Sequence, residues 1–264
     1  MYAIAGVTGH VGGATARELI TARAPVRVVV RDPAQGRAWR ELGAEIAVAD
    51  FTDATALAAA FAGCAGAFVM LPTIPDVDDA GHRRLADSIA AAVDGSDVPH
   101  VVALSSVGAD LPEGTGPIRW LHHLEGRLRQ GSAVVTAIRS PHFQEKVEVV
   151  LDAAIGDGVY PVFGESADEP LPMVATRDIG AAAAQFLLSP RATAEAVDLE
   201  APSYTEREVA EKLGVALGRE LQVVTIPPAG WLEALTAADV PPLACRRAGR
   251  AVRRRAAEPS AASW

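Results

Sequence analysis

YAIAGVTGHVGG, residues 2–13, is the stretch of this chain that decides its fold. An apolar run typical of a strand leads into Gly6, Gly9 and Gly12, spaced GxxGxxG, and a helical pattern follows. Glycine adopts positive φ and lets a ligand approach the backbone closely. The N-terminus of the next helix presents unpaired N–H groups to an anion. The stretch therefore predicts a strand–turn–helix unit that binds a nucleotide pyrophosphate, and because no GK[ST] follows, it is not a P-loop.

Apolar runs and helical patterns alternate through about the first half of the chain. We expect strands at residues 2–7, 26–30, 45–48, 67–71, 100–104 and 133–138, with helices between them. Strands that alternate with helices form βαβ units, and right-handed crossovers arrange these units as a doubly wound sheet. The sequence therefore predicts an α/β fold with a parallel Rossmann-type sheet, whose ligands bind at the carboxyl ends of the strands.

A looser α/β pattern follows residue 155. Its expected elements are short strands at residues 160–163, 171–174, 196–199 and 222–226, and helices at residues 176–188 and 205–217. We predict a dinucleotide-binding domain at residues 1–155, a smaller C-terminal α/β substrate lobe at residues 156–240, and an Arg/Ala-rich tail at residues 241–264. Some strands of the lobe can return to the main sheet.

The amino-acid composition argues against some classes of binding partner. The net charge of −9 and the aromatic content of 5% argue against nucleic-acid binding, which needs a basic surface and stacking platforms. Cys64 and Cys245 stand far apart outside any CxxC pattern, so we expect neither a metal site nor a disulfide framework. A small-molecule substrate is expected, and the chain is either a monomer or a homodimer.

The uncharged residues 54–72 need an interpretation, because their length approaches that of a membrane span. Gly63 and Gly66 interrupt them, so a short helix, a turn and a buried strand fit better. No basic stretch typical of a signal peptide precedes the first strand. We therefore expect a cytoplasmic protein with no membrane segment.

Six short motifs along the chain together resemble one protein family. In order they are Gly6-x-x-Gly9-x-x-Gly12, Val30-Arg31-Asp32-Pro33, Ala49-Asp50-Phe51-Thr52-Asp53, Ser105-Ser106-Val107-Gly108, Thr136-Ala137-Ile138-Arg139-Ser140-Pro141-His142-Phe143 and Ala175-Thr176-Arg177-Asp178-Ile179. Over about residues 1–235 this set is similar to the NmrA-like family of atypical short-chain dehydrogenases/reductases. The resemblance implies an NAD(P)-binding Rossmann fold. Related members include NADPH-dependent quinone reductases, isoflavone-reductase-type enzymes and redox-sensing regulators that bind the cofactor without turning it over.

Residues at and just after the expected strand ends are the candidate cofactor contacts, some by position and others by the family resemblance. They are Gly6, Thr8, Gly9, His10, Val11, Gly12, Arg31, Asp50, Phe51, Leu71, Pro72, Ser105, Ser106, Pro141, His142 and Phe143. Arg31 stands where the 2′-phosphate of NADP would lie, and a planar guanidinium suits phosphate. The acidic Asp32 beside it is the residue type that favours NAD. Because Arg31 comes first and the resemblance places an arginine there, we expect NADP(H) to be favoured over NAD(H).

The expected helix after the fifth strand bears on catalysis. Typical short-chain reductases carry a Tyr-x-x-x-Lys pair there, but residues 117–128 contain neither Tyr nor Lys. His123 stands about where the family often has Lys, and either it or His122 is a candidate proton donor. The alternative is a surface or ribose-contacting histidine. Ser105 is a candidate hydrogen-bond donor to a substrate oxygen, or else a residue that only caps its strand.

The missing Tyr–Lys pair suits an acceptor whose reduced form is already a stabilised anion, such as a quinone. The sequence therefore favours an NADPH-dependent reductase of a quinone-like or conjugated acceptor. A redox-sensing regulator that binds NADP(H) without turnover is the alternative, and a biosynthetic tailoring reductase or an isomerase is a third. Glu145 and Lys146 stand where the family often has Asn, so they alter either the substrate pocket or a helix N-terminus.

Overall fold

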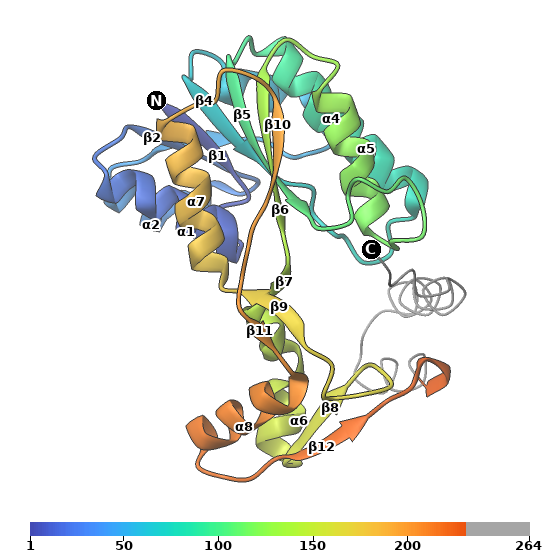
Figure 1. Ribbon diagram of the computed structural model, residues 1–264. Helices are drawn as coiled ribbons and strands as arrows, with labels where there is room; N and C mark the ends of the chain where they lie inside the picture. Colours follow the sequence, from blue (N-terminus) through green and yellow to red (C-terminus); the bar gives the residue numbers. More distant parts are fainter. Residues whose placement is uncertain (231–264) are drawn as a thin grey trace.

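A computed structural model describes residues 1–230. They form a larger and a smaller lobe, which the chain crosses between more than once (Figure 1). The expected tail at residues 241–264, the last residues of the expected substrate lobe and Cys245 lie outside the described residues.

The larger lobe is built on a seven-stranded sheet in which every neighbouring pair is parallel. In spatial order the strands are β10 (Glu195–Asp198), β6 (Val134–Ser140), β5 (His100–Ser106), β4 (Gly66–Val69), β1 (Tyr2–Ala5), β2 (Val26–Val30) and β3 (Glu45–Val48). The predicted doubly wound parallel sheet is confirmed. The strand order reverses between β1 and β4, which is the switch point where dinucleotides bind in such sheets. The seventh strand, β10, comes from the stretch after residue 155 and pairs with β6.

Helices cover both faces of this sheet (Figure 1). One face carries α1 (His10–Thr21), η1 (Pro33–Gly36), α2 (Arg37–Glu41) and α7 (Thr176–Leu188), and the other carries α3 (Ala54–Phe61), α4 (Asp79–Gly95) and α5 (Ile118–Leu128). Gly180 lets α7 pack directly on α1, because a Cβ there would lie 2.8 Å from the backbone nitrogen of Thr15. Like β10, α7 therefore lies with the large sheet although it follows the first residues of the small lobe.

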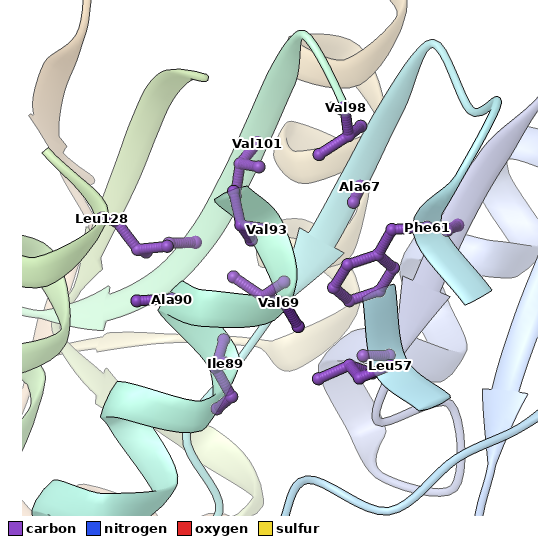
Figure 2. Packing of buried hydrophobic residues seen from close by; sticks show 14 of the residues in the cluster. Leu57, Phe61, Ala67, Val69, Ile89, Ala90, Val93, Val98, Val101 and Leu128 are labelled. Atoms are coloured by element: carbon purple, nitrogen blue, oxygen red, sulfur yellow. The ribbon is translucent and has the colours of Figure 1, made fainter. Parts of the chain in front are cut away.

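Figure 2 shows the apolar side chains packed between the sheet and helices α3, α4 and α5. Phe61 of α3, Val69 of β4, and Ile89 and Val93 of α4 are each at most 2% exposed. A fully buried side chain of this kind contributes roughly 1.5–3 kcal/mol. Strands buried on both faces are mostly apolar along their length, and the polar side chains within this sheet, such as Thr136 of β6, are themselves buried. Polar groups that can reach a ligand therefore gather at the strand ends.

The smaller lobe contains two short sheets. One joins β11 (Ser203–Tyr204), β9 (Leu171–Val174) and β7 (His142–Phe143), and the other joins β12 (Gln222–Thr225) and β8 (Val159–Val162). Its helical segments are η2 (Gln144–Val150), α6 (Leu151–Gly156), α8 (Glu206–Leu217) and η3 (Pro228–Gly230). A small core centred on Ala154, Tyr160 and Ala210 holds them together. Because β7 continues from the carboxyl end of β6, the smaller lobe lies beyond that edge of the large sheet (Figure 1).

The uncharged residues 54–72 form α3, a turn at Gly63 and the buried strand β4, as the sequence predicts. Across residues 1–230, no helix is both long enough and apolar enough to cross a bilayer.

Candidate functional site

The glycine turn between β1 and α1 is formed by backbone alone. Gly6 adopts a φ of 71°, and the N–H of Gly9 donates to the carbonyl oxygen of Gly6 at 3.0 Å. A Cβ on Gly12 would lie 2.7 Å from the carbonyl carbon of Gly6, so only glycine lets α1 approach the turn this closely. Gly9 precedes α1 without a side-chain acceptor, so no cap takes up the first-turn N–H groups that an anion would use.

The other three candidates of the turn point in different directions. Thr8 is exposed and lines a hollow beside Gly6, whereas Val11 is buried in the core. Nε2 of His10 lies 3.2 Å from Oε2 of Glu148 in η2, and both side chains are more than half exposed. This pair connects the turn to the segment that follows β7.

A hollow at the carboxyl ends of β1 and β2 brings several candidates together. Its lining includes Gly6, Thr8, Arg31 and Phe51. Asp50 precedes Phe51, and its carboxylate accepts the backbone N–H of Thr52 at 2.8 Å and the hydroxyl at 2.6 Å. These hydrogen bonds, together with the charge of Arg31, lower the pKa of Asp50 although partial burial raises it.

Arg31 and Asp32, the two residues that bear on the choice of cofactor, have different surroundings. The carboxylate of Asp32 accepts the N–H of Ala34 at 2.9 Å and thereby caps η1. Arg31 is exposed at the hollow, and its charge acts on Asp50. The carboxylate of Asp32 is therefore engaged in a local cap, whereas the guanidinium of Arg31 borders the space where a ligand would lie.

Leu71 and Pro72 belong to the loop after β4, where Leu71 is buried and Pro72 half-buried. The buried His82 of α4 holds this loop. Its Nδ1 donates to the carbonyl oxygen of Asp78 at 2.9 Å, and its Nε2 accepts the N–H of Ile74 at 3.1 Å, which assigns the neutral tautomer. Sequence reasoning missed His82, because a single histidine within a helical pattern carries no distinguishing signal.

Ser105, near the end of β5, belongs to a buried charge network. Its hydroxyl donates to Oε1 of Glu125 at 2.5 Å, and Arg139 donates to both carboxylate oxygens at 3.0 and 2.8 Å. Arg129 donates to Oε2 at 2.7 Å. Burial raises the pKa of Glu125, but the hydrogen bonds from Arg139 and Ser105 and the two arginine charges bring it below its ordinary value. Since Ser105 is only 3% exposed and its hydroxyl donates to Glu125, it is engaged within the protein rather than open to a cleft.

The remaining candidates, at the end of β5 and after β6, are half-buried. Ser106 donates its hydroxyl to the carbonyl oxygen of Val107 at 3.1 Å. Pro141, His142 and Phe143 follow β6, and the last two form β7. These residues lead from the carboxyl edge of the sheet into the smaller lobe.

His122 and His123 face different neighbours, as their separation of about 100° around a helix predicts. Nε2 of His123 lies 2.9 Å from Oδ1 of Asp87 in α4, and its Nδ1 lies 3.4 Å from Arg83. Nδ1 of His122 lies 2.8 Å from the carbonyl oxygen of Ala109, in the loop after β5. His123 therefore takes part in the contact between α4 and α5, and His122 lies beside a loop of the carboxyl edge.

A cavity of about 500 Å³ lies in the smaller lobe next to β7, and we call it the lobe cavity. Segments η2, β8, β9 and the start of α8 contribute to its lining, together with His142 and Phe143. In its wall the hydroxyl of Tyr160 donates to Oε2 of Glu206 at 2.7 Å. Sequence reasoning missed this pair, because its members stand 46 residues apart and in no motif.

Glu145 and Lys146 have separate roles. Both carboxylate oxygens of Glu145 accept the N–H of Thr176 at 3.0 Å, at the start of α7. Lys146 lines the lobe cavity. Glu145 thus lies at a helix N-terminus and Lys146 at the cavity, the two places that the sequence left open. No group of three or more His, Cys, Asp and Glu side chains in residues 1–230 is arranged to hold a metal ion.

Comparisons with known proteins agree with this architecture. A model of the NmrA-like family matches residues 2–242. An NAD(P)H azoreductase of Xenophilus azovorans is 27% identical over 245 residues, which cover 91% of this chain and 82% of that protein.

Solved structures are similar over nearly the whole chain. A Citrobacter sp. triphenylmethane reductase complexed with NADP(H) superimposes with a TM-score of 0.82 at 20% identity, covering 100% of this chain and 93% of that one. An Escherichia coli NADPH-dependent quinone oxidoreductase complexed with NADPH gives a TM-score of 0.79 at 20% identity, covering 96% and 90%. At these identities the likeness establishes the fold.

Proposed function

Since the chain belongs to the NmrA-like family, as its six ordered motifs indicated, we propose that it is an NADPH-dependent reductase. Its acceptor is quinone-like or otherwise conjugated. The observation that carries the proposal is the uncapped glycine turn at the switch point of the sheet, with Arg31 lining the same hollow. The relatives whose names are azoreductase and quinone oxidoreductase support the assignment to reductases of conjugated acceptors.

The residues of the turn fit a dinucleotide. A Cβ at Gly9 would meet only the carbonyl oxygen of Gly6, at 3.5 Å, so the side of the turn that a pyrophosphate would approach is not filled by protein. The N–H groups that begin α1 would hold the pyrophosphate, and the hollow beside Phe51 would hold the adenosine. When bound, the cofactor supplies the hydride for reduction.

Two side chains support a preference for NADPH over NADH. The guanidinium of Arg31 is exposed at the hollow, where it can donate two parallel hydrogen bonds to a phosphate. One oxygen of the Asp32 carboxylate is already engaged by the N–H of Ala34, which makes Asp32 the weaker candidate for a ribose contact. The preference therefore rests on Arg31.

We infer the class of acceptor from the side chains that could donate a proton to the reduced product. Residues 117–128 offer no Tyr–Lys pair to protonate an alkoxide. A quinone-like acceptor yields a stabilised anion after hydride transfer and needs a dedicated donor less than a ketone does. His122 is the candidate donor of choice, because it borders the loop after β5, whereas His123 is paired with Asp87 on the helical side.

The test is NADPH oxidation with a panel of quinones, azo compounds, enones and simple ketones. We expect turnover with the conjugated acceptors and little with the ketones. His122→Ala should lower turnover by roughly 10²–10⁴ if it donates the proton, and His123→Ala is the matched control. Tight cofactor binding with no NADPH oxidation by any acceptor would instead favour a redox-sensing regulator.

A further inference from the structure

The lobe cavity has an uneven set of charges. Glu165, Glu169 and Glu206 contribute three carboxylates to its lining, against the single ammonium of Lys146. His142 and Tyr160 are the other titratable side chains of the lining. Burial lowers the pKa of His142, Glu206 opposes this shift, and Lys146 adds to it. At neutral pH the lining is therefore negative.

Glu206 is the carboxylate best placed to contact a ligand. The hydroxyl of Tyr160, which is 3% exposed, fixes one carboxylate oxygen at 2.7 Å. Burial and the neighbouring Glu206 raise the pKa of Tyr160 above its ordinary value of 10.0, so the phenol stays protonated and keeps donating. Tyr160 thus acts as a positioning residue for a half-buried carboxylate.

The position of Glu206 at the start of α8 suits a negatively charged side chain. It is the first residue of this helix, where the helix dipole stabilises an anion. Glu165 and Glu169, by contrast, are exposed to solvent, which screens their charges. Among the salt bridges of residues 1–230, none neutralises Glu206. A ligand that brings a positive charge or an N–H donor would fill that role.

We propose that the lobe cavity binds the electron acceptor through Glu206 and selects aromatic acceptors that carry a cationic or N–H-donating nitrogen over acceptors that carry a sulfonate. The proposal rests on the proposed function, because it names the substrate class of that reductase. Lys146 is the positively charged side chain of the lining, so it weakens the preference for cationic acceptors without reversing it. An anionic acceptor would meet three carboxylates for one favourable contact.

The test uses two azobenzenes of the same shape and opposite charge. The probes are the trimethylammonium derivative and the sulfonate derivative, each substituted at the para position, with unsubstituted azobenzene as the neutral reference. Dissociation constants are measured with NADP⁺ present, so that nothing is reduced. We expect the cation to bind about tenfold more tightly than the anion at low salt, and this ratio to shrink as salt is added.

Variants locate the source of the preference. Glu206→Gln should reduce the ratio to about twofold or less, and Tyr160→Phe should give an intermediate ratio because the charge remains but is no longer fixed. Glu211→Gln, on an exposed position of the same helix, should leave the ratio unchanged. Equal binding of cation and anion by the unaltered protein, or an unchanged ratio in Glu206→Gln, would overturn the proposal.

NADPH oxidation by the same three compounds is measured separately. If none of them, and no quinone, oxidises NADPH, the proposed function fails, while the binding ratio still decides whether Glu206 recognises cations. If turnover occurs but the ratio is flat, the reductase stands and this inference falls. Should Glu206→Gln not fold, Tyr160→Phe and the salt dependence together still decide the question.

Discussion

At the proposed cofactor site on the carboxyl edge of the large sheet, the groups available to a ligand are largely backbone, whereas in the lobe cavity, the proposed acceptor site, they are side chains. The glycine turn offers N–H groups and space, and Arg31 adds one charged side chain. The lobe cavity instead gathers Tyr160, Glu206 and Lys146 from three segments of the chain. A backbone site recognises what all dinucleotides share, and a side-chain site can change its ligand by one substitution. If both proposals hold, this difference would let one fold keep its cofactor while its acceptor varies.

The largest effect on stability is expected from the buried network of Ser105, Glu125, Arg129 and Arg139 near the carboxyl edge. The described lining of the lobe cavity has no comparable network. Glu125→Gln removes a buried carboxylate and leaves Arg139, 13% exposed, without its main partner. We expect a loss of about 3–5 kcal/mol in the free energy of unfolding, measured with denaturant. Glu41→Gln, which removes an exposed pair with Arg37, should cost less than about 0.5 kcal/mol.

The same network predicts a pH dependence. The folded state holds the pKa of Glu125 below its ordinary value of 4.5. Its stabilising contribution is therefore complete above about pH 4.5 and is lost as the pH falls through the lowered value. The free energy of unfolding of Glu125→Gln should lack this part of the acid-dependent decline. Equal slopes for the variant and the unaltered protein would contradict the assignment.

Substitutions in the glycine turn test ligand binding separately from folding. Gly9 has φ −94°, and a Cβ there would make only an ordinary contact of 3.5 Å with the carbonyl oxygen of Gly6, so Gly9→Val should fold while its side chain blocks the pyrophosphate. We expect about a hundredfold weaker binding of both NADPH and NADH. Gly12→Ala should instead lose stability and binding together, because its Cβ would collide with the carbonyl of Gly6. Normal cofactor binding by a folded Gly9→Val would mean that the turn has no ligand role.

Arg31 is the charged side chain that lines the hollow of the proposed cofactor site. Arg31→Ala should weaken NADPH binding by roughly 1.5–3 kcal/mol, the contribution of a charge-assisted hydrogen bond, and should leave NADH binding nearly unchanged. Arg37→Ala is the matched control, because that guanidinium is exposed and lies 3.8 Å from Glu41. Titrations with both cofactors measure the effect. Equal losses for NADPH and NADH would remove the phosphate role from Arg31.

The backbone site was largely predictable from sequence, and the side-chain site was not. Glycine spacing after a strand reports local geometry, and residues at parallel strand ends meet at one edge, so Gly6, Thr8, Arg31 and Phe51 came together as expected. The seventh strand β10 was only an open possibility, because its four residues, EAVD, have low β-propensity apart from Val197 and do not specify a partner. The pair of Tyr160 and Glu206 depends on the tertiary packing of the small lobe, which no local pattern encodes.

Ser105 is the residue for which sequence position and three-dimensional contacts differ most, and the expected effect of changing it is the smallest. Its place near the end of β5 suggests a substrate contact, yet its hydroxyl lies 2.5 Å from Glu125 in a buried network. Ser105→Ala should cost only about 1 kcal/mol in the free energy of unfolding, because Arg139 and Arg129 still hold the carboxylate.

Kinetic measurements distinguish a structural role of Ser105 from a role at the reacting centre. If it only supports the edge, kcat and the acceptor KM of Ser105→Ala should stay within about threefold of the unaltered values, since no ligand contact is lost. Ser106→Ala, beside it but half-buried, is the comparison variant. A fall in kcat of tenfold or more, with the free energy of unfolding unchanged, would return Ser105 to the reacting centre. The carboxyl edge would then recognise its ligands with a side chain at β5 as well as with the backbone of the glycine turn.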